Sequence, residues 1–187
     1  MKRRLSPLAL ACLGSLLAAC GSAPSADTDG GPVQVSEVLP PYVEVPRFKD
    51  LAPGVAGGGQ PTLEAIRALA ERGYTTLINL RTDPELLGGE AETAQAAGLR
   101  YVRIPVSGSS LSLADAARLR EILLESRGGP VFIHCASGNR VGGIWGLYRA
   151  LTEGLTPRET EQAARRAGLR SDALAERVRS ELEFVRD

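Results

Sequence analysis

Short apolar runs alternate with helical patterns along the chain from residue 54 onward. Four runs predict strands, at 54–58, 75–80, 99–104 and 131–133. Segments with apolar residues at helical spacing predict helices, at 62–72, 90–97, 112–124, 140–153, 157–167 and 172–185. Strands separated by helices predict an α/β domain with a mostly parallel central sheet flanked by helices on both faces.

Polar residues mark the points where three of these helices begin. Thr62 precedes the first helix as an N-cap. Ser112 with Asp115, and Thr156 with Glu159, have the spacing of capping boxes, in which a hydroxyl and a carboxylate each accept a backbone N–H. We therefore expect helices to start directly after Thr62, Ser112 and Thr156.

The apolar spacing also predicts which helix faces are buried. Leu124 continues the apolar side of the helix at 112–124, and Leu151 continues that of the helix at 140–153. Gly142 and Gly143 lie inside the second of these helices, where each costs about 1 kcal/mol relative to alanine. We therefore expect this helix to pack against the sheet too closely for larger side chains.

Residues 131–143 have the sequence VFIHCASGNRVGG, which predicts a strand, a tight loop and a helix start. The only histidine, His134, ends the strand, and Cys135 follows it. A loop at a helix N-terminus presents unpaired N–H groups and the positive end of the helix dipole, which bind anions and favour a thiolate. Arg140 can hold two oxygens of a tetrahedral anion with its planar fork. This order predicts a cysteine nucleophile in an anion-binding loop, with an inert buried cysteine as the alternative.

The N-terminal segment has the features of a bacterial lipoprotein signal. Lys2-Arg3-Arg4 is followed by an apolar stretch that is too short to span a bilayer comfortably. Leu17-Ala18-Ala19-Cys20 resembles the lipobox, which implies removal of residues 1–19 and lipidation of Cys20. An ordinary signal peptide or an N-terminal anchor helix is the alternative.

Lipidation of Cys20 would attach the protein to the bacterial cell envelope, on the periplasmic face of a membrane. Gly21 and Ser22 lack the aspartate that often signals inner-membrane retention, which favours the outer membrane. Residues 20–47 are rich in small and turn-forming residues and predict a flexible tether. Residues 48–187 then form one domain of ordinary size.

Composition narrows the choice of partners and cofactors. The loss of Lys2, Arg3 and Arg4 with the signal reduces the 22 basic residues to 19, against 22 acidic ones. This mildly acidic balance gives no indication of a nucleic-acid partner. A single histidine and one free cysteine, Cys135, cannot build a zinc site from the usual ligands, so we expect no metal and no cofactor.

Three blocks of residues together resemble a known family. They are Gly58-Gly59-Gln60-Pro61, Thr76-Leu77-Ile78-Asn79-Leu80-Arg81 and His134-Cys135-Ala136-Ser137-Gly138-Asn139-Arg140. In this order and spacing they are similar to the beta-lactamase-hydrolase-like, phosphatase-like family, which is related to dual-specificity and tyrosine phosphatases. The resemblance covers roughly residues 48 to 153 and implies a cysteine-phosphatase α/β fold.

The resemblance also implies a phosphocysteine mechanism and a small phosphorylated substrate. In that mechanism Cys135 attacks phosphorus, and His134 orients the cysteine. The phosphoryl oxygens are then held by Arg140 and by the backbone amides of Ala136, Ser137, Gly138 and Asn139.

The chain departs from the phosphatase pattern in three respects. The spacing is Cys-x4-Arg, one residue shorter than in phosphatases and similar to the loop of rhodanese-type sulfurtransferases. Val141 stands where phosphatases usually carry a serine or threonine. The loop at 106–110 lacks the aspartate that serves as general acid. The nearest carboxylates by sequence are Asp83, Glu85 and Asp115, for each of which a capping or solvated role is the simpler interpretation.

Three hypotheses follow for the function. The first is a phosphatase-like cysteine hydrolase of phosphate monoesters. The second is a sulfurtransferase that carries sulfur from a small anionic donor as a Cys135 persulfide, which the short loop favours. The third is a lipoprotein that binds anions without catalysis.

Overall fold

The structure, a computed structural model, describes residues 44–183. Its centre is a five-stranded sheet in the order β1-β2-β5-β3-β4. The strands are β1 (Lys49–Ala52), β2 (Val55–Gly58), β3 (Thr76–Asn79), β4 (Arg100–Arg103) and β5 (Val131–His134). Strands β2, β5, β3 and β4 are parallel, and only β1 is antiparallel to its neighbour, which confirms the predicted sheet.

Strand β1 was not predicted, because nothing in its sequence marks it as a strand. It contains two charged residues, Lys49 and Asp50, and none of its four residues is buried. It pairs with β2 through backbone hydrogen bonds at the edge of the sheet, with an irregular register between Asp50 and Ala52. Backbone pairing of this kind leaves no apolar pattern in a sequence.

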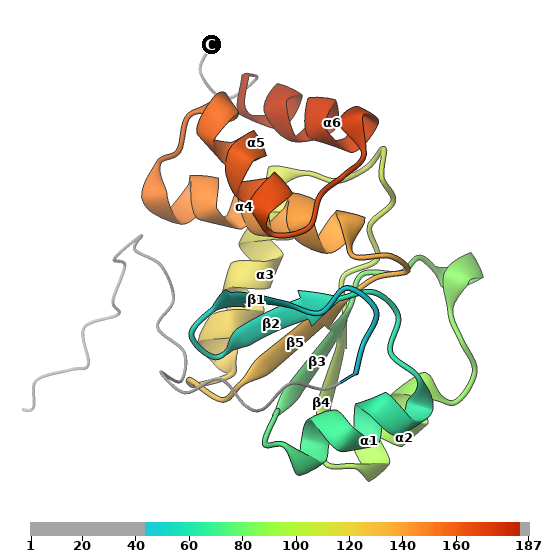
Figure 1. The fold of residues 1–187 in the computed structure, drawn as a ribbon. Coiled ribbons are helices and arrows are strands. Elements are labelled where there is room, and N and C mark those ends of the chain that lie inside the picture. Colours follow the sequence, from blue (N-terminus) through green and yellow to red (C-terminus); the bar gives the residue numbers. More distant parts are fainter. Residues whose placement is uncertain (1–43, 184–187) are drawn as a thin grey trace, which may run out of the picture.

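Helices cover both faces of the sheet (Figure 1). They are α1 (Leu63–Glu71), η1 (Asp83–Glu85), α2 (Glu90–Ala96), α3 (Leu113–Glu125), α4 (Asn139–Glu153), α5 (Pro157–Arg166) and α6 (Asp172–Glu183), of which η1 is a 3-10 turn. Helices α1 and α2 pack on one face around Phe132. Helices α3 and α4 cover the other face, and α5 and α6 pack on α4 as an outer layer.

The predicted caps at three helix starts are confirmed. Thr62 accepts a hydrogen bond from Ala65 N, and capping boxes begin α3 and α5. The predicted burial of Leu124 and Leu151 is wrong, since these side chains are 50% and 42% exposed. Successive residues in a helix point about 100° apart, so the burial of Leu123 and Ala150 turns the next residue outward.

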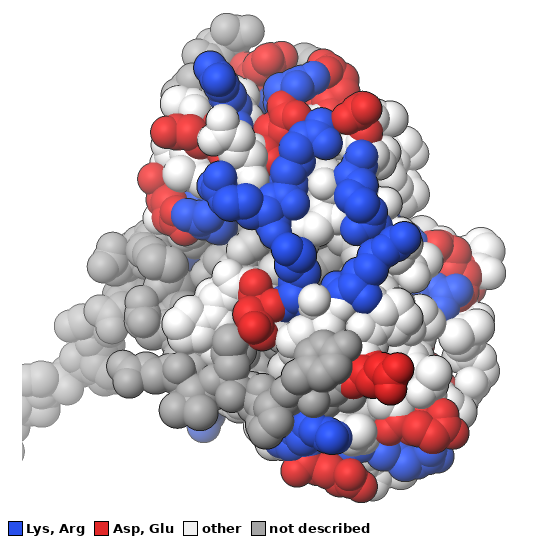
Figure 2. Space-filling model, in the orientation of Figure 1, with Lys and Arg blue, Asp and Glu red and all other residues white. Residues whose placement is uncertain are grey.

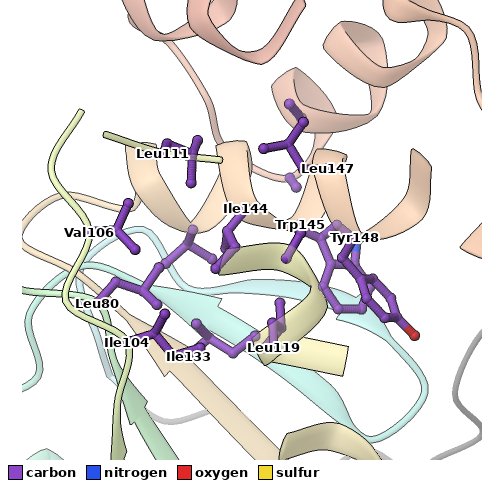
Figure 3. Close-up of a cluster of buried hydrophobic side chains, with 14 of the residues drawn as sticks. Leu80, Ile104, Val106, Leu111, Leu119, Ile133, Ile144, Trp145, Leu147 and Tyr148 are labelled. Carbon is purple, nitrogen blue, oxygen red and sulfur yellow. The ribbon is translucent and has the colours of Figure 1, made fainter. Parts of the chain in front are cut away.

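The larger part of the core lies between the sheet, α3 and α4. Figure 3 shows Ile133 of β5, Leu119 of α3 and Ile144 of α4 meeting in this cluster, with Trp145 and Tyr148 beside them. The two aromatic rings are 4.8 Å apart, and both side chains are buried. Helix α4 is therefore buried between the sheet and the outer helices.

From the sequence we expected the glycines of α4 to face the sheet. They face other neighbours instead. A Cβ on Gly142 would lie 2.7 Å from Ala164 O in α5, and a Cβ on Gly143 would lie 2.6 Å from Leu111 Cδ2. Gly146 likewise faces Ala164. The glycines therefore allow close approach of the outer layer, whereas Ile144 fills the space next to the sheet.

The carboxyl ends of the four parallel strands lie at one edge of the sheet, which is where α/β proteins place their ligands. The loop that follows β5 and the segments that follow β3 and β4 meet there, as described below. Among residues 44–183 no helix is long and apolar enough to cross a membrane. The predicted signal at 1–19, the lipidation site Cys20 and the tether up to residue 43 lie outside the described residues.

Candidate active site

The loop between β5 and α4 holds Cys135 at its base. Gly138 adopts a left-handed backbone, with φ of 82°, and serves as the N-cap of α4. Its N–H donates a hydrogen bond to Cys135 Sγ over 3.1 Å. The Cys135 side chain is 1% exposed and forms no disulfide. The loop therefore folds tightly around the thiol at the N-terminus of a 15-residue helix.

Arg140, in the first turn of α4, is held by groups from the neighbouring strands. Its Nη1 and Nη2 atoms donate to the two carboxylate oxygens of Glu85 over 2.7 and 2.6 Å. Nη1 also donates to Val106 O at 2.8 Å and to Leu80 O at 3.4 Å. These contacts fix Arg140 between its own loop and the segments that follow β3 and β4.

The paired charges of Arg140 and Glu85 stabilise each other. The hydrogen bonds from Arg140 lower the pKa of Glu85 to about 2. The same hydrogen bonds raise the pKa of Arg140, and the neighbouring Cys135 raises it further. None of the four bonds that fix Arg140 uses its Nε–H, and a guanidinium has five N–H donors. Arg140 therefore keeps donors for an anion beside Cys135.

A buried carboxylate, Glu90, lies behind the loop. His134 Nε2 is 3.2 Å from Glu90 Oε1. Asn79 Nδ2 and Tyr101 OH donate to the same oxygen over 2.6 and 2.8 Å, and Gln60 Nε2 donates to Oε2 over 2.5 Å. Burial by itself would raise the pKa of Glu90, but these donors lower it to about 2. Glu90 is therefore a charged centre that fixes four side chains.

Arg81 extends this network toward the surface. Its Nη1 donates to Gln60 Oε1 at 2.6 Å, and its backbone N–H donates to Asn79 Oδ1 at 2.7 Å. Glu90 and Arg81 thus connect Gln60, Asn79 and His134, which belong to three separate blocks of the sequence. The structure brings these blocks together around one carboxylate.

A pocket of about 440 Å³ opens beside Arg140. It is formed by the loops after β3 and β4, the start of α4 and the α5–α6 connection, and its lining residues are Thr82, Glu85, Ser107, Gly108, Asn139, Arg140, Ser171 and Leu174. Asn139 Oδ1 accepts hydrogen bonds from the backbone N–H groups of Arg170 and Ser171, at 2.7 and 3.3 Å. Asn139 thereby attaches the α5–α6 connection to the loop that holds Cys135.

This domain matches a known family over most of its described length. Residues 47–152 match the model of the family described as beta-lactamase hydrolase-like protein, phosphatase-like domain. The chain belongs to this family. A beta-lactamase hydrolase-like protein from Xylella fastidiosa (strain 9a5c) is 36% identical over 110 residues, which are 56% of this chain and 25% of that protein. The chain thus spans about a quarter of the length of this curated relative.

Solved structures of phosphatases share the fold of this domain. Tk-PTP in its active form superposes with a TM-score of 0.64 at 23% identity, covering 74% of this chain and 97% of the other. The core catalytic domain of the PP-IP phosphatase SIW14 from S. cerevisiae has a TM-score of 0.59 at 21% identity, with coverage of 80% and 92%. At this identity the likeness shows the fold, which confirms the predicted cysteine-phosphatase-like architecture.

Within this phosphatase-like domain, the three carboxylates named from the sequence as nearest to the loop have other partners. Asp83 is 81% exposed and forms an ion pair of 2.5 Å with Arg103. Asp115 accepts hydrogen bonds from Ser112 N and Oγ at 2.9 and 2.8 Å, so its capping role is confirmed. Glu85, whose pKa is about 2, is ionised at neutral pH and has no proton to donate.

Sequence reasoning missed Glu90 and the contact of Glu85 with Arg140. The capping interpretation of Glu85 is confirmed, since Thr82 N and Oγ1 donate to its carboxylate at 2.9 and 2.7 Å. Glu85 follows Asp83-Pro84 in a polar turn, and its contact with Arg140 joins residues 55 positions apart. Glu90 begins a helix, which is an ordinary place for an exposed acidic residue, yet it is 2% exposed. The one available signal was that the Gln60, Asn79 and His134 blocks each place a polar residue at the end of a strand.

Residues 44–183 contain no cluster of histidine, cysteine and acidic side chains that could hold a metal ion.

Proposed function

We propose that the chain is a cysteine-dependent, phosphatase-like hydrolase of phosphate monoesters. The observation that supports this most directly is the position of Cys135 at the N-terminus of α4, beside an Arg140 guanidinium that Glu85 holds in place. Such an arrangement gives a nucleophile and a binding site for an anion in one loop. Membership of a phosphatase-like family agrees with it.

In the proposed reaction the Cys135 thiolate attacks the phosphorus of the substrate. An S–P bond forms and the P–O ester bond breaks, and the leaving oxygen takes a proton from water. Water then attacks the phosphocysteine, the S–P bond breaks, and inorganic phosphate and the thiolate are released. The remaining N–H donors of Arg140 and the amides of residues 136–139 stabilise the charge on the phosphoryl oxygens throughout.

The proposed chemistry favours substrates whose leaving group needs no acid. The carboxylates nearest to the loop are ionised or have other partners. The loop after β4 carries serines in place of an acid, and Ser107 Oγ lies 2.9 Å from Ser110 Oγ. The lack of a general acid typically lowers the rate about 10²- to 10⁴-fold. Aryl phosphates, which leave as weakly basic phenolates, are therefore the preferred test substrates.

The test is phosphate release from 4-nitrophenyl phosphate by the reduced full-length protein, with Cys135→Ser as the control. We expect release that disappears in the variant, while both proteins show the same far-UV circular dichroism. Equal release by Cys135→Ser, or no release by a folded protein whose thiol is titratable, would reject the proposal. In the second case, the next assay is sulfur transfer from thiosulfate to cyanide, and a negative result there would leave anion binding without catalysis.

A sulfurtransferase is the second candidate, favoured by the six-residue loop from Cys135 to Arg140. The Gly138 N–H at 3.1 Å from Sγ leaves a small space around the thiol, which suits a single terminal sulfur better than a phosphoryl group. In this reaction the thiolate takes the outer sulfur of thiosulfate, releases sulfite and passes the sulfur to cyanide as thiocyanate. Thiocyanate formation that requires Cys135, without phosphate release, would select this candidate.

For the location of the protein in the cell, we propose that the domain is attached to the bacterial envelope through lipidated Cys20. Its support is the sequence Leu17-Ala18-Ala19-Cys20, which resembles a lipobox and follows a basic and then an apolar segment. The substrate would then be a small phosphorylated anion on the periplasmic face of the membrane.

A further inference from the structure

A second pocket, of about 260 Å³, is lined in part by Gly138 of the loop that holds Cys135. Its lining residues are Arg47, Phe48, Lys49, Gly57, Gly58, Gly138, Val141, Ala167, Gly168 and Arg170. They come from β1 and the segment before it, from β2, from the start of α4 and from the α5–α6 connection. The proposed hydrolysis uses none of the three basic residues in this set.

Arg47 and Arg170 are fixed toward each other at the rim of this pocket. Arg47 Nη1 and Arg170 Nη2 donate to the same carbonyl oxygen, Ser137 O, over 2.9 and 2.8 Å. Arg47 has a left-handed backbone with φ of 57°, which is uncommon for a residue other than glycine. Two cationic side chains are therefore held beside one carbonyl group, although like charges repel.

The positive charge at this rim is not neutralised by the protein. Within residues 44–183, neither Arg47, Lys49 nor Arg170 forms an ion pair with a carboxylate. Most other arginines on α3–α6 have such a partner, as Arg140 has in Glu85. Figure 2 shows Lys and Arg side chains on this face of the molecule, over and below α5 and α6, with Asp and Glu side chains beside several of them. Uncompensated positive charge around a concavity attracts anions.

The rest of this pocket is apolar. Phe48 stacks on buried Phe132 with the rings 5.7 Å apart, and Val141 and Ala167 are buried beside it. The glycines at 57 and 58 contribute no side chain. An anionic group attached to a carbon skeleton fits this combination of a basic rim and an apolar floor.

The two pockets share the loop that holds Cys135. Gly138 lines the second pocket, and Asn139 and Arg140 line the first. Arg170 and Ser171 are divided between the pockets in the same way. Consecutive residues of the loop and of the α5–α6 connection therefore line both pockets, which makes the two pockets neighbours.

We propose that the pocket between Arg47, Lys49 and Arg170 binds a second anionic group, a phosphate or a carboxylate, of the substrate whose phosphoryl group binds at Arg140. The preferred substrates are then small molecules with two or more anionic groups. This proposal rests on the proposed phosphatase function for its biological meaning, but it concerns binding and can be tested without turnover.

The test compares two ligands that differ by one phosphate, fructose 1,6-bisphosphate and fructose 6-phosphate. Their binding to full-length Cys135→Ser protein, which cannot form phosphocysteine, is measured by titration calorimetry at low salt. We expect the bisphosphate to bind at least about tenfold more tightly, as for a gain of charge-assisted hydrogen bonds. Lys49→Gln, which removes a charge without removing a contact to Ser137, should reduce this ratio about threefold.

Two further variants make the test specific. Arg170→Gln should reduce the ratio more than Lys49→Gln, because Arg170 is fixed at the rim. Arg127→Gln is the matched control, since Arg127 precedes β5 at the opposite end of the sheet, and it should leave the ratio unchanged. Equal affinities for the two ligands, or a ratio that all three variants leave unchanged, would overturn the proposal. Neither result depends on phosphate release, so failure here is distinct from failure of the proposed hydrolysis.

Discussion

Glu90 is enclosed by side chains from four parts of the fold. Gln60 precedes α1, Asn79 ends β3, Tyr101 lies on β4 and His134 ends β5, and each has a polar atom within 3.2 Å of the Glu90 carboxylate. A buried charge is tolerated only when its partners are in place, because an isolated one loses its hydration without compensation. Glu90 therefore links the candidate loop to β3, β4 and the segment before α1.

Replacement of Glu90 by glutamine should destabilise the protein by roughly 3 kcal/mol, since buried donors lose a charged acceptor. The folded-state pKa of about 2 lies below the ordinary value of 4.5. The stabilisation is therefore fully present above pH 4.5 and is lost as the pH falls toward 2. Urea unfolding at pH 7 and at pH 3 measures both effects.

Glu92→Gln is the control for this change, because Glu92 lies on the same helix and is exposed. We expect its free energy of unfolding to differ from that of the wild type by no more than about 0.5 kcal/mol at either pH. Equal losses for the two variants would show that Glu90 has no special role.

Glu85 is a positioning residue for Arg140, since it binds the guanidinium and has no proton to give at neutral pH. Glu85→Gln keeps the shape of the side chain but removes its charge. We expect kcat/KM for 4-nitrophenyl phosphate to fall about tenfold, the loss of roughly one charged hydrogen bond. The shape of the pH–rate profile should stay the same, because no catalytic proton is removed.

Asp83→Asn is the matched control for Glu85→Gln. Asp83 lies in the same turn, but its partner is Arg103 and its side chain is 81% exposed. Its kcat/KM should be close to that of the wild type. A larger loss for Asp83→Asn than for Glu85→Gln, with loss of one limb of the pH profile, would instead identify Asp83 as the general acid.

At the scale of elements, α4 combines the end of the candidate loop with the packing of the outer helices. Its first turn carries Arg140, while Gly142 and Gly146 allow α5 to approach. Asn139 adds a hydrogen-bonded link to the α5–α6 connection, and that connection supplies residues to both pockets. The contact between α4 and α5 therefore shapes the site as well as the core.

Gly146→Ala tests this contact. A Cβ at this position would lie 2.7 Å from Ala164 Cβ and 3.0 Å from Thr160 O, so α5 must move. Although alanine favours a helix by about 1 kcal/mol, overpacking should outweigh this and destabilise the protein by about 1–3 kcal/mol. Gly88→Ala is the control, since a Cβ there meets nothing within 4 Å. If thermal unfolding showed Gly146→Ala to be as stable as the wild type, the close contact would be dispensable.

At the scale of the whole molecule, the domain carries its candidate site at one edge of the sheet, and the proposed anchor lies in the sequence before it. Cys20→Ser should transfer the protein from the membrane to the soluble fraction of a bacterium with an outer membrane, because stable attachment of this kind requires lipid chains. Detergent phase partitioning measures the change. Cys12→Ser, within the segment expected to be removed, should leave the distribution as in the wild type. A Cys20→Ser protein that remains fully in the membrane would contradict lipidation at this residue.

The sequence by itself determined the elements whose signals are local. Strands β2, β3 and β5 followed from short apolar runs, and β4 followed from alternating polarity. The helix starts at Thr62, Ser112 and Thr156 followed from hydroxyl side chains near free N–H groups. The order of residues from Val131 to Arg140 also located the candidate loop. These features depend on neighbours a few positions away, which is why a linear pattern reveals them.

Only the tertiary structure decided which side chains surround the loop. Glu85 meets Arg140, Glu90 meets His134, and Arg47 meets Ser137 across 55, 44 and 90 positions of sequence. Ion pairs and hydrogen bonds at such separations have no periodicity, because the fold and not the local chain sets their distance. Strand β1 likewise exists through pairing with β2. The candidate role of Cys135 was thus proposed from its own loop, whereas the groups that orient Arg140 and form the second pocket required the folded chain.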